Sequence, residues 1–261
     1  MNSTRRKLAI ATWGPPDEGN IYGKLTVDAT ELIKFMEHVR QKTGEKVTVT
    51  HMVGKAVAMG LAKAPGLNGR IAWGTYIPHP TVDITYLVAL EDGADLAKVK
   101  IAELDKKPVS AVATELRARA EKLRKGQDSE FEKSKGMLKL LPSWLLRPIV
   151  KLTGWLTGAL GLSVPALGLE AYPFGSCIIT SVGMLGIDEA FAPHTPFARV
   201  PILVLVGSVK ETPVVRDGAV VVRQQLTMTA TVDHRFVDGF QLATVAKTIR
   251  ATLENPWDLQ P

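Results

Sequence analysis

Two β-like runs near the C-terminal end of the chain constrain its fold more than any other feature. The segment TPVVRDGAVVVRQQLTMTATVD places the pair Asp217-Gly218 between β-branched runs, which is typical of a hairpin turn. Two further apolar runs, GSCIITSVG and ARVPILVLVGSVK, precede it. From Gly175 onward the sequence therefore predicts a long sheet with antiparallel strands.

The first part of the chain carries helical patterns. A strand ending near Val27 is followed by a helix that we expect Asp28 to cap, and a second helix is expected to stop at Pro65 and Gly66. His51 begins this second helix. In that position we expect a core or capping histidine, not a ligand.

The middle and the end of the chain complete the pattern. Strands are expected at 70–76 and 82–90, a charged helix in KKPVSAVATELRARAEKLRKG, and a last helix after Asp238. The buried stripe of that last helix is expected to consist of Leu242, Val245, Ile249 and Leu253. Early helices and late strands predict an α/β fold of the α+β, two-layer kind.

Composition limits the environment of the chain. Its 261 residues are 46% hydrophobic, which is enough for a substantial core, and we expect a single domain over 1–261. Cys177 has no partner for a disulfide, and the five histidines have no zinc spacing, so we expect no metal and a reducing compartment. The N-terminal segment lacks the apolar core of a signal peptide, which predicts a cytoplasmic location.

The positive charge is concentrated in one window. The net charge is +6, and residues 133–169 contain five basic side chains and no acidic one. The rest of the chain is nearly neutral, so no extended basic face is expected and nucleic acid is not an expected partner.

Common catalytic motifs are missing from the sequence. It contains no GxSxG, no GxGxxG after a strand, no Walker GxxxxGK[ST] and no HExxH. The usual hydrolase, dinucleotide, nucleotide and metalloprotease hypotheses lose their main support.

The stretch TATVDHRFVDGF offers a candidate site. Alternating apolar residues end at Asp233-His234-Arg235, which places His234 at the rim of a sheet, where catalytic groups are often held. Asp238 suits the N-cap of the last helix. Taken alone, His234 fits an ordinary polar loop residue better than a catalytic one.

A second stretch, SCIITSVGMLGIDEAF, ends another β-run with Thr180 and Ser181. Alone, these hydroxyls suit turn formation. Together with His234 they supply what acyl transfer to a thiol requires, which is a base for the thiol proton and a donor to the oxyanion of the tetrahedral intermediate.

Several motifs carry a family resemblance. DHRFVDG closely resembles the DHRxxDG signature of the catalytic domain of 2-oxoacid dehydrogenase acyltransferases, the dihydrolipoamide acyltransferases related to chloramphenicol acetyltransferase. IITSVGMLGIDEAFAP and VPILVLVGSVKETPVVRDGAVVVRQQLTMTATVDHR are similar to further family segments, as are GKLTVDATELIKFMEHVRQ, VDITYLVAL and LENPWDL. The resemblance covers nearly the whole chain outside about 127–174.

This resemblance implies a fold and a set of roles. The fold would be a chloramphenicol acetyltransferase-like mixed sheet with helices packed on one side, assembled as a homotrimer with active sites between subunits. His234 would be the general base, Asp238 would support its loop, and Thr180, or less favourably Ser181, would bind the oxyanion. Arg6 is the candidate partner of Asp238. The substrates would be CoA thioesters and a dihydrolipoamide-like thiol.

The sequence also departs from the family. It shows no lipoyl domain, so a lipoyl group would be supplied only in trans by another protein, and ALEDGADLAKVKI replaces a family LVVPVI stretch. Whether trimers join into a larger cage, and whether the chain serves a dehydrogenase complex, stays open.

The region at about 127–174 is an apolar and basic insertion with three interpretations. The first interpretation is a helical hairpin that packs on a neighbouring subunit or covers the channel. The second is a peripheral membrane segment at 136–168, and the third is a spanning helix. Residues 152–169 carry no charge, but their glycines and Pro165 disfavour spanning.

Two hypotheses for function follow. The first is a stand-alone acyltransferase that uses His234. The second is a catalytically weak scaffold or cage component that acts through membrane or partner contacts of the 136–168 segment. The intact DHRFVDG heptad favours the first.

Overall fold

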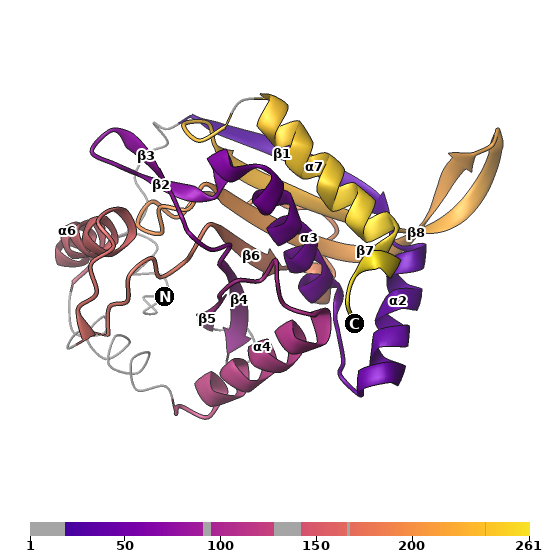
Figure 1. Ribbon diagram of the computed structural model, residues 1–261, viewed down its shortest axis with the longest axis horizontal. Coiled ribbons are helices and arrows are strands. Elements are labelled where there is room, and N and C mark those ends of the chain that lie inside the picture. Colours follow the sequence, from indigo (N-terminus) through magenta and orange to yellow (C-terminus); the bar gives the residue numbers. More distant parts are fainter. Residues whose placement is uncertain (1–18, 91–94, 128–141, 166–167, 238) are drawn as a thin grey trace.

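A six-stranded mixed sheet, with helices on one of its faces, organises the chain (Figure 1). The computed structural model describes residues 19–90, 95–127, 142–165, 168–237 and 239–261. The strands lie in the order β1-β8-β7-β6-β4-β5. Their bounds are β1 Asn20–Asp28, β4 Ile84–Leu90, β5 Asp95–Ile101, β6 Cys177–Ser181, β7 Ile202–Arg216 and β8 Ala219–Asp233.

The position of β6 makes the sheet mixed. β6 pairs parallel with both β4 and β7, whereas β1 with β8, β7 with β8, and β4 with β5 pair antiparallel. The prediction of an antiparallel sheet from Gly175 onward is therefore wrong for β6. The chain returns along residues 182–201 before β7 begins, and this return makes the parallel pairing possible.

The long hairpin of β7 and β8 confirms the predicted turn. Arg216 pairs with Ala219, and Asp217 and Gly218 have φ values of 51° and 79°. Two successive left-handed residues suit the twist of a tight hairpin, and Asp-Gly tolerates this conformation. β1 pairs with β8 only as far as Gln225, so the outer part of the hairpin projects from the body as a two-stranded ribbon (Figure 1).

Four long helices lie on the sheet: α2 Thr30–Thr43, α3 Val49–Lys63, α4 Val109–Arg124 and α7 Gly239–Glu254. The expected cap of α2 is corrected, because Ala29 occupies the cap position without a side-chain bond. The Asp28 carboxylate instead accepts a hydrogen bond of 3.0 Å from the amide of Thr30. The capping prediction for His51 is confirmed, since its Nδ1 accepts a bond of 3.1 Å from the Thr48 amide and its side chain is buried.

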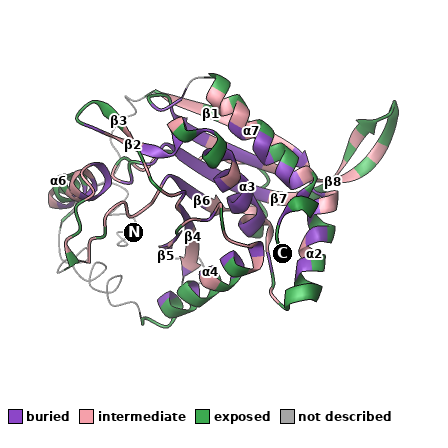
Figure 2. Ribbon diagram, viewed as in Figure 1, coloured by how far each residue is buried: buried purple, intermediate pink, exposed green. Residues whose placement is uncertain are grey.

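The main core lies between these helices and the sheet (Figure 2). Val245, Ile249 and Leu253 of α7 are buried in it, and Leu242 packs against it partly buried, so the predicted stripe is confirmed. On the strands, alternate residues such as Cys177, Ile179 and Met228 face this core.

One strand prediction needs correction, and one strand was missed. The strand expected at 70–76 is a small hairpin of β2 (Gly69–Ala72) and β3 (Thr75–Pro78). Its turn, Trp73-Gly74, has φ values of 53° and 72°, which a continuous strand cannot contain. β5 was not predicted. It forms in the ALEDGADLAKVKI stretch and pairs with β4.

The described part of the insertion contains a helix, α6 (Ser143–Gly154), and a π-helical turn, η3 (Trp155–Ala159). Leu146 and Val150 of α6 are buried, whereas Trp144 and Leu152 are exposed. No helix among the described residues is long and apolar enough to span a membrane. Residues 128–141 lie outside the description, so the predicted helical hairpin stays a prediction.

Short 3-10 helices complete the described chain. They are η1 Pro65–Leu67 after α3, η5 Gly183–Leu185 after β6, and η6 Pro256–Asp258 after α7.

Candidate active site

His234 lies immediately after the last residue of β8, at the rim predicted from the sequence. The amide of Asp233 donates to Pro201 O at 2.9 Å, and the amide of His234 donates to Gly19 O at 3.2 Å. The His234 side chain is exposed. Backbone bonds to two neighbouring segments therefore fix the main chain and leave the imidazole accessible.

An ion pair between a buried aspartate and an exposed arginine links the two residues that flank His234. The Asp233 carboxylate is buried and accepts bonds of 3.0 Å from both the amide and Nε of Arg235, and a second guanidinium nitrogen lies 2.5 Å from it. The sequence indicated that these two residues lie at the rim of the sheet, but it indicated no role for them. The signal was the spacing in Asp233-His234-Arg235, because two opposite charges stand on either side of the candidate histidine.

Thr180 and Ser181 end β6 and are half-buried. Thr180 pairs with Leu205 of β7, and Ser181 pairs with Val206. Because Ile179 and Val206 belong to the helix-covered core, strand alternation directs Thr180 to the opposite face of the sheet and Ser181 toward the helices.

The structure does not bring Thr180 and His234 together within one chain. Leu205, the neighbour of Thr180, pairs with Thr229 of β8, and His234 follows Thr229 by five residues. At about 3.3 Å per residue, this offset is about 16 Å along the strands. β6 is separated from β8 by β7, which adds about 10 Å across the sheet.

Two residues of the predicted site cannot be placed. Asp238 and Arg6 lie outside the described residues. Their proposed pairing, and the capping role of Asp238 for α7, stay predictions.

Other reactive groups in the described chain are poorly suited to catalysis. Burial raises the pKa of the Cys177 thiol far above its ordinary value, so the thiolate is disfavoured. Burial also lowers the pKa values of His51 and His79 to about 4. No group of three or more metal-ligating side chains occurs among the described residues.

Solved structures define the class of fold. The chain superposes on a probable dihydrolipoamide acetyltransferase of Listeria monocytogenes with a TM-score of 0.70 and 21% identity, over 97% of this chain and 92% of the other. It superposes on the cubic core of a pyruvate dehydrogenase multienzyme complex with a TM-score of 0.68 and 22% identity, over 92% and 83%. A chloramphenicol acetyltransferase gives a TM-score of 0.52 at 12% identity, over 97% and 96%. The predicted fold class is confirmed.

The sequence match then identifies the family. A family model described as 2-oxoacid dehydrogenases acyltransferase (catalytic domain) matches residues 20–139 and 166–260, and the chain belongs to this family. It is 24% identical over 238 residues to the dihydrolipoyllysine-residue acetyltransferase component of the acetoin cleaving system of Bacillus subtilis (strain 168). That match covers 89% of this chain and 48% of the relative, so the chain spans less than half the length of this curated relative.

The family match bears on the insertion as well. Residues 140–165, which include α6, lie between the two matched parts. The boundaries predicted for the insertion, about 127–174, and the single-domain organisation stay predictions.

Proposed function

We propose that this chain is an acyltransferase that moves an acyl group between CoA and a dihydrolipoamide-like thiol. The observation that carries the proposal is the position of DHRFVDG in a chain of this family: His234 lies exposed at a strand end whose neighbours are fixed by backbone bonds and an ion pair. The wider function of the Bacillus relative, an acetyltransferase component, supports the same chemistry.

In the proposed steps, one proton is removed and later returned, and one carbon–sulfur bond forms while another breaks. The His234 imidazole removes the proton from the incoming thiol, and the thiolate attacks the thioester carbonyl carbon. The Thr180 hydroxyl donates to the oxyanion of the tetrahedral intermediate. The bond to the departing sulfur breaks, and the imidazolium returns its proton to that sulfur. A positioned base contributes about 10²–10⁴-fold and one oxyanion donor about 10²–10³-fold.

The strand register supports a site that is shared between two copies of the chain. Thr180 lies about 16 Å along the sheet from His234 of its own chain, and it points to the face without helices. A second copy on that face would bring its His234 to the first copy's Thr180. A homotrimer, with three such sites, is the proposed active form. Ser181 faces the helices and is the weaker candidate.

The proposed role of Asp238 is to hold the His234 loop, with Arg6 as its partner. Asp233 and Arg235 already fix the other side of that loop. The two acidic residues would thus anchor the residues before and after His234.

The first test measures acyl transfer from acetyl-CoA to dihydrolipoamide. His234→Ala should lower kcat by at least about 10²-fold and leave the assembly intact. His38→Ala changes an exposed histidine on α2 and is the matched control. Wild-type turnover in His234→Ala would refute the assignment.

The second test asks whether the site is shared. His234→Ala and Thr180→Ala chains are co-expressed and purified as mixed oligomers. If each site combines His234 of one copy with Thr180 of the next, random trimers regain about one quarter of wild-type activity. If both residues serve the same chain, the mixture stays as inactive as the single variants.

Partners and location follow as further proposals. A lipoyl group carried in trans by another protein would be the acceptor in a dehydrogenase complex, and trimers would form the building unit of any larger cage. Cytoplasmic location stays a prediction. Light scattering of the purified chain measures its mass and separates a trimer from a cage.

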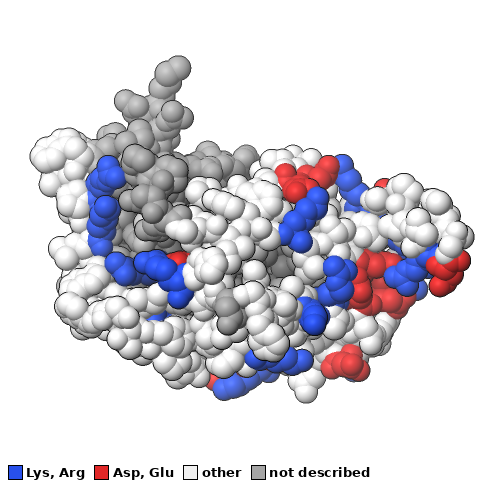
Figure 3. Space-filling model, turned by 90° about the horizontal axis from the view of Figure 1, so that it is seen from above, with Lys and Arg blue, Asp and Glu red and all other residues white. Residues whose placement is uncertain are grey.

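Contact between α6 and a membrane is a second proposal with its own support. α6 exposes Trp144 and Leu152 beside the basic residues Arg147 and Lys151, a combination that suits an anionic lipid surface. On the face shown in Figure 3, basic side chains lie in separate groups, some beside acidic ones. Flotation with phosphatidylserine-containing vesicles should recover the wild type and not Trp144→Ser. Equal recovery would contradict this role and the scaffold hypothesis built on it.

A further inference from the structure

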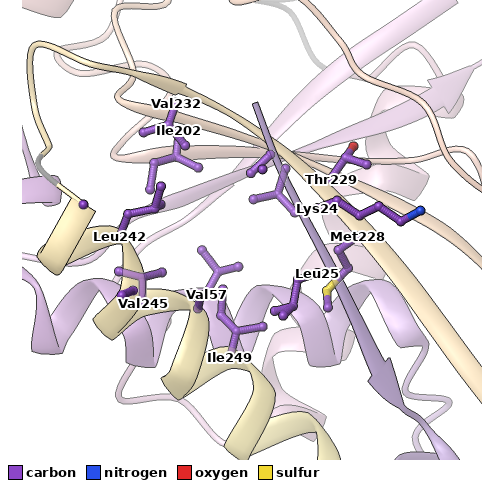
Figure 4. Close-up of a pocket in the computed structure, with 16 residues that line it drawn as sticks. Lys24, Leu25, Val57, Ile202, Met228, Thr229, Val232, Leu242, Val245 and Ile249 are labelled. Carbon is purple, nitrogen blue, oxygen red and sulfur yellow. The ribbon is translucent and has the colours of Figure 1, made fainter. Parts of the chain in front are cut away.

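A cavity of about 370 Å³ lies between the edge strand β1 and helix α7 (Figure 4). Residues from β1, α3, β7, β8 and α7 line it. Its volume falls at the lower end of the range of about 300–1,000 Å³ that is typical of small-molecule sites. The cavity has no role in the steps described above.

The lining of this cavity is almost wholly hydrocarbon. Aliphatic side chains surround the space, among them Leu25, Val57, Ile202, Leu242, Val245 and Ile249 (Figure 4). Two of the lining residues have polar side-chain groups, Lys24 and Thr229, and both use them elsewhere. The Lys24 ammonium points away from the cavity and pairs with Glu189, and the Thr229 hydroxyl donates to Ala190 O.

This chemistry selects the kind of ligand. A carboxylate, sugar or phosphate inside the cavity would lose water without gaining a partner, which is costly. An alkyl chain would instead gain from the removal of apolar surface from water. The cavity therefore suits a hydrocarbon chain whose polar end stays outside.

Small residues keep the space open. Gly23, Ala230, Gly239, Ala243 and Ala246 all line the cavity. A Cβ atom added at Gly23 would meet no atom within 4 Å. Protein interiors are otherwise close-packed, so a space of this size marks a place where packing is relaxed.

One end of the cavity lies near the candidate base. Val232 of β8 lines the cavity, and His234 follows it by two residues, which is at most about 7 Å along the chain. Gly239, the first residue of α7, also lines it. A chain buried here could thus leave its carbonyl end beside the His234 loop.

We infer that this cavity binds the alkyl chain of the transferred acyl group, and that the preferred acyl group is an unbranched hydrocarbon chain longer than acetyl. The inference rests on the proposed function, because it names the substrate class of the same site. An acetyl group would leave the cavity empty, and an acyl group with a terminal carboxylate would bury a charge there.

The test compares acetyl-, butyryl-, hexanoyl- and octanoyl-CoA as donors to dihydrolipoamide. The wild type should show kcat/KM rising about fourfold per added methylene until the cavity is full. Ala246→Leu fills the cavity and should lower the ratio of octanoyl to acetyl transfer at least tenfold. Ala251→Leu makes the same change at an exposed position of α7 outside the lining and should keep the ratio. Gly23→Leu fills the cavity from β1 and serves as a second variant if Ala246→Leu fails to fold.

Octanoate binding, measured by calorimetry, separates the two proposals. His234-dependent transfer with no preference for chain length, or a ratio that Ala246→Leu and Gly23→Leu leave unchanged, overturns the inference while the proposed function stands. No transfer from any donor, together with octanoate binding that both variants abolish, overturns the proposed function and supports an alkyl-chain site. If neither transfer nor binding is found, both proposals fail.

Discussion

The two faces of the six-stranded sheet differ in how completely this chain covers them. The face under α2, α3, α4 and α7 buries one large continuous core (Figure 2). On the opposite face, the described residues form one small cluster of four buried side chains, Ile178, Ala198, Val200 and Leu203. The helix-covered face contributes most of the buried apolar residues, whereas the open face offers surface for contacts beyond one chain.

The open face also carries exposed apolar side chains beside the candidate oxyanion donor. Met184 and Leu185 follow β6 and are 77% and 69% exposed. Tyr22 and Phe191 contact each other edge to face at 5.7 Å and are also exposed. Thr180 lies on the face without helices, which is where the proposed second copy would contact it.

The first prediction compares how substitutions on the two faces change the free energy of unfolding, where the largest difference is expected. Leu226 of β8 is fully buried in the large core, and Leu226→Ala should lower the free energy of unfolding by about 2–5 kcal/mol. Leu185→Ala removes the same atoms from the open face and should change it by less than about 0.5 kcal/mol. Urea denaturation measures both. Equal losses would show that the open face is packed as tightly as the core.

The second prediction concerns acid sensitivity of the helix-covered face. His51 has a pKa lowered by burial to about 4, against 6.5 for the free side chain. Between these values the unfolded chain binds the proton and the folded chain does not. The contribution of His51 to the free energy of unfolding is therefore fully present above pH 6.5. It is lost as the pH falls toward 4, and the loss amounts to up to about 3 kcal/mol.

A variant isolates this effect. His51→Gln keeps an acceptor for the Thr48 amide at the start of α3 and removes the titrating group. Its unfolding free energy should fall less steeply than that of the wild type between pH 6.5 and 4. His79, whose pKa burial also lowers to about 4, contributes the same sign in both proteins. Parallel curves for wild type and variant would contradict the role of His51.

Much of the fold was predictable because local rules and tertiary packing agree there. Asp217-Gly218 fits the turn that a tight hairpin needs, and the 3.6-residue stripe of α7 meets the sheet as expected. His51 was correctly predicted from its place at a helix start. At these positions the local preferences of the residues and the tertiary packing favour the same conformation.

Other features depend on contacts that no local pattern contains. Trp73-Gly74 splits a predicted strand, and β5 forms because β4 offers it an edge. Lys55 is buried on α3 and donates to the carbonyls of Asp105 and Lys107 at 2.7 Å, a use of a lysine that only the folded chain reveals.

The candidate site also has one feature that the sequence predicted and one that it did not. The sequence marked His234 and Thr180 as strand-end residues. The offset between them along the sheet follows from the parallel pairing of β6 with β7, which the sequence did not predict.

The third prediction concerns the Asp233–Arg235 pair beside His234. Arg235→Met leaves the buried Asp233 carboxylate without its guanidinium, at a cost of about 1–2 kcal/mol in unfolding free energy. Acyl transfer should fall through kcat, since the loop that presents His234 loses one anchor. Arg250→Met on α7 removes an exposed arginine paired with Glu254 and is the control. A normal kcat in Arg235→Met would show that this pair does not position the histidine.

The last prediction concerns Leu185→Asp, which should have a small effect on folding and a large effect on assembly. Leu185→Asp places a charge among the exposed apolar side chains of the open face, where it stays hydrated in one isolated chain, so the unfolding free energy should change by less than about 0.5 kcal/mol. In an interface the same carboxylate would be desolvated without a partner, so light scattering should show a shift from trimer to monomer. Acyl transfer should fall with it, because Thr180 and His234 would no longer meet.

Ile33→Asp provides the comparison on the other side of the molecule. Ile33 is an exposed apolar residue of α2, on the helix-covered face, and its variant should keep both the trimer and the activity. Dissociation by both variants would mean that added charge alone weakens the oligomer. A Leu185→Asp protein that kept its mass would remove the open face from the interface. Thr180 would then have no second copy to serve, and the shared site would have to be abandoned even if His234 proved essential.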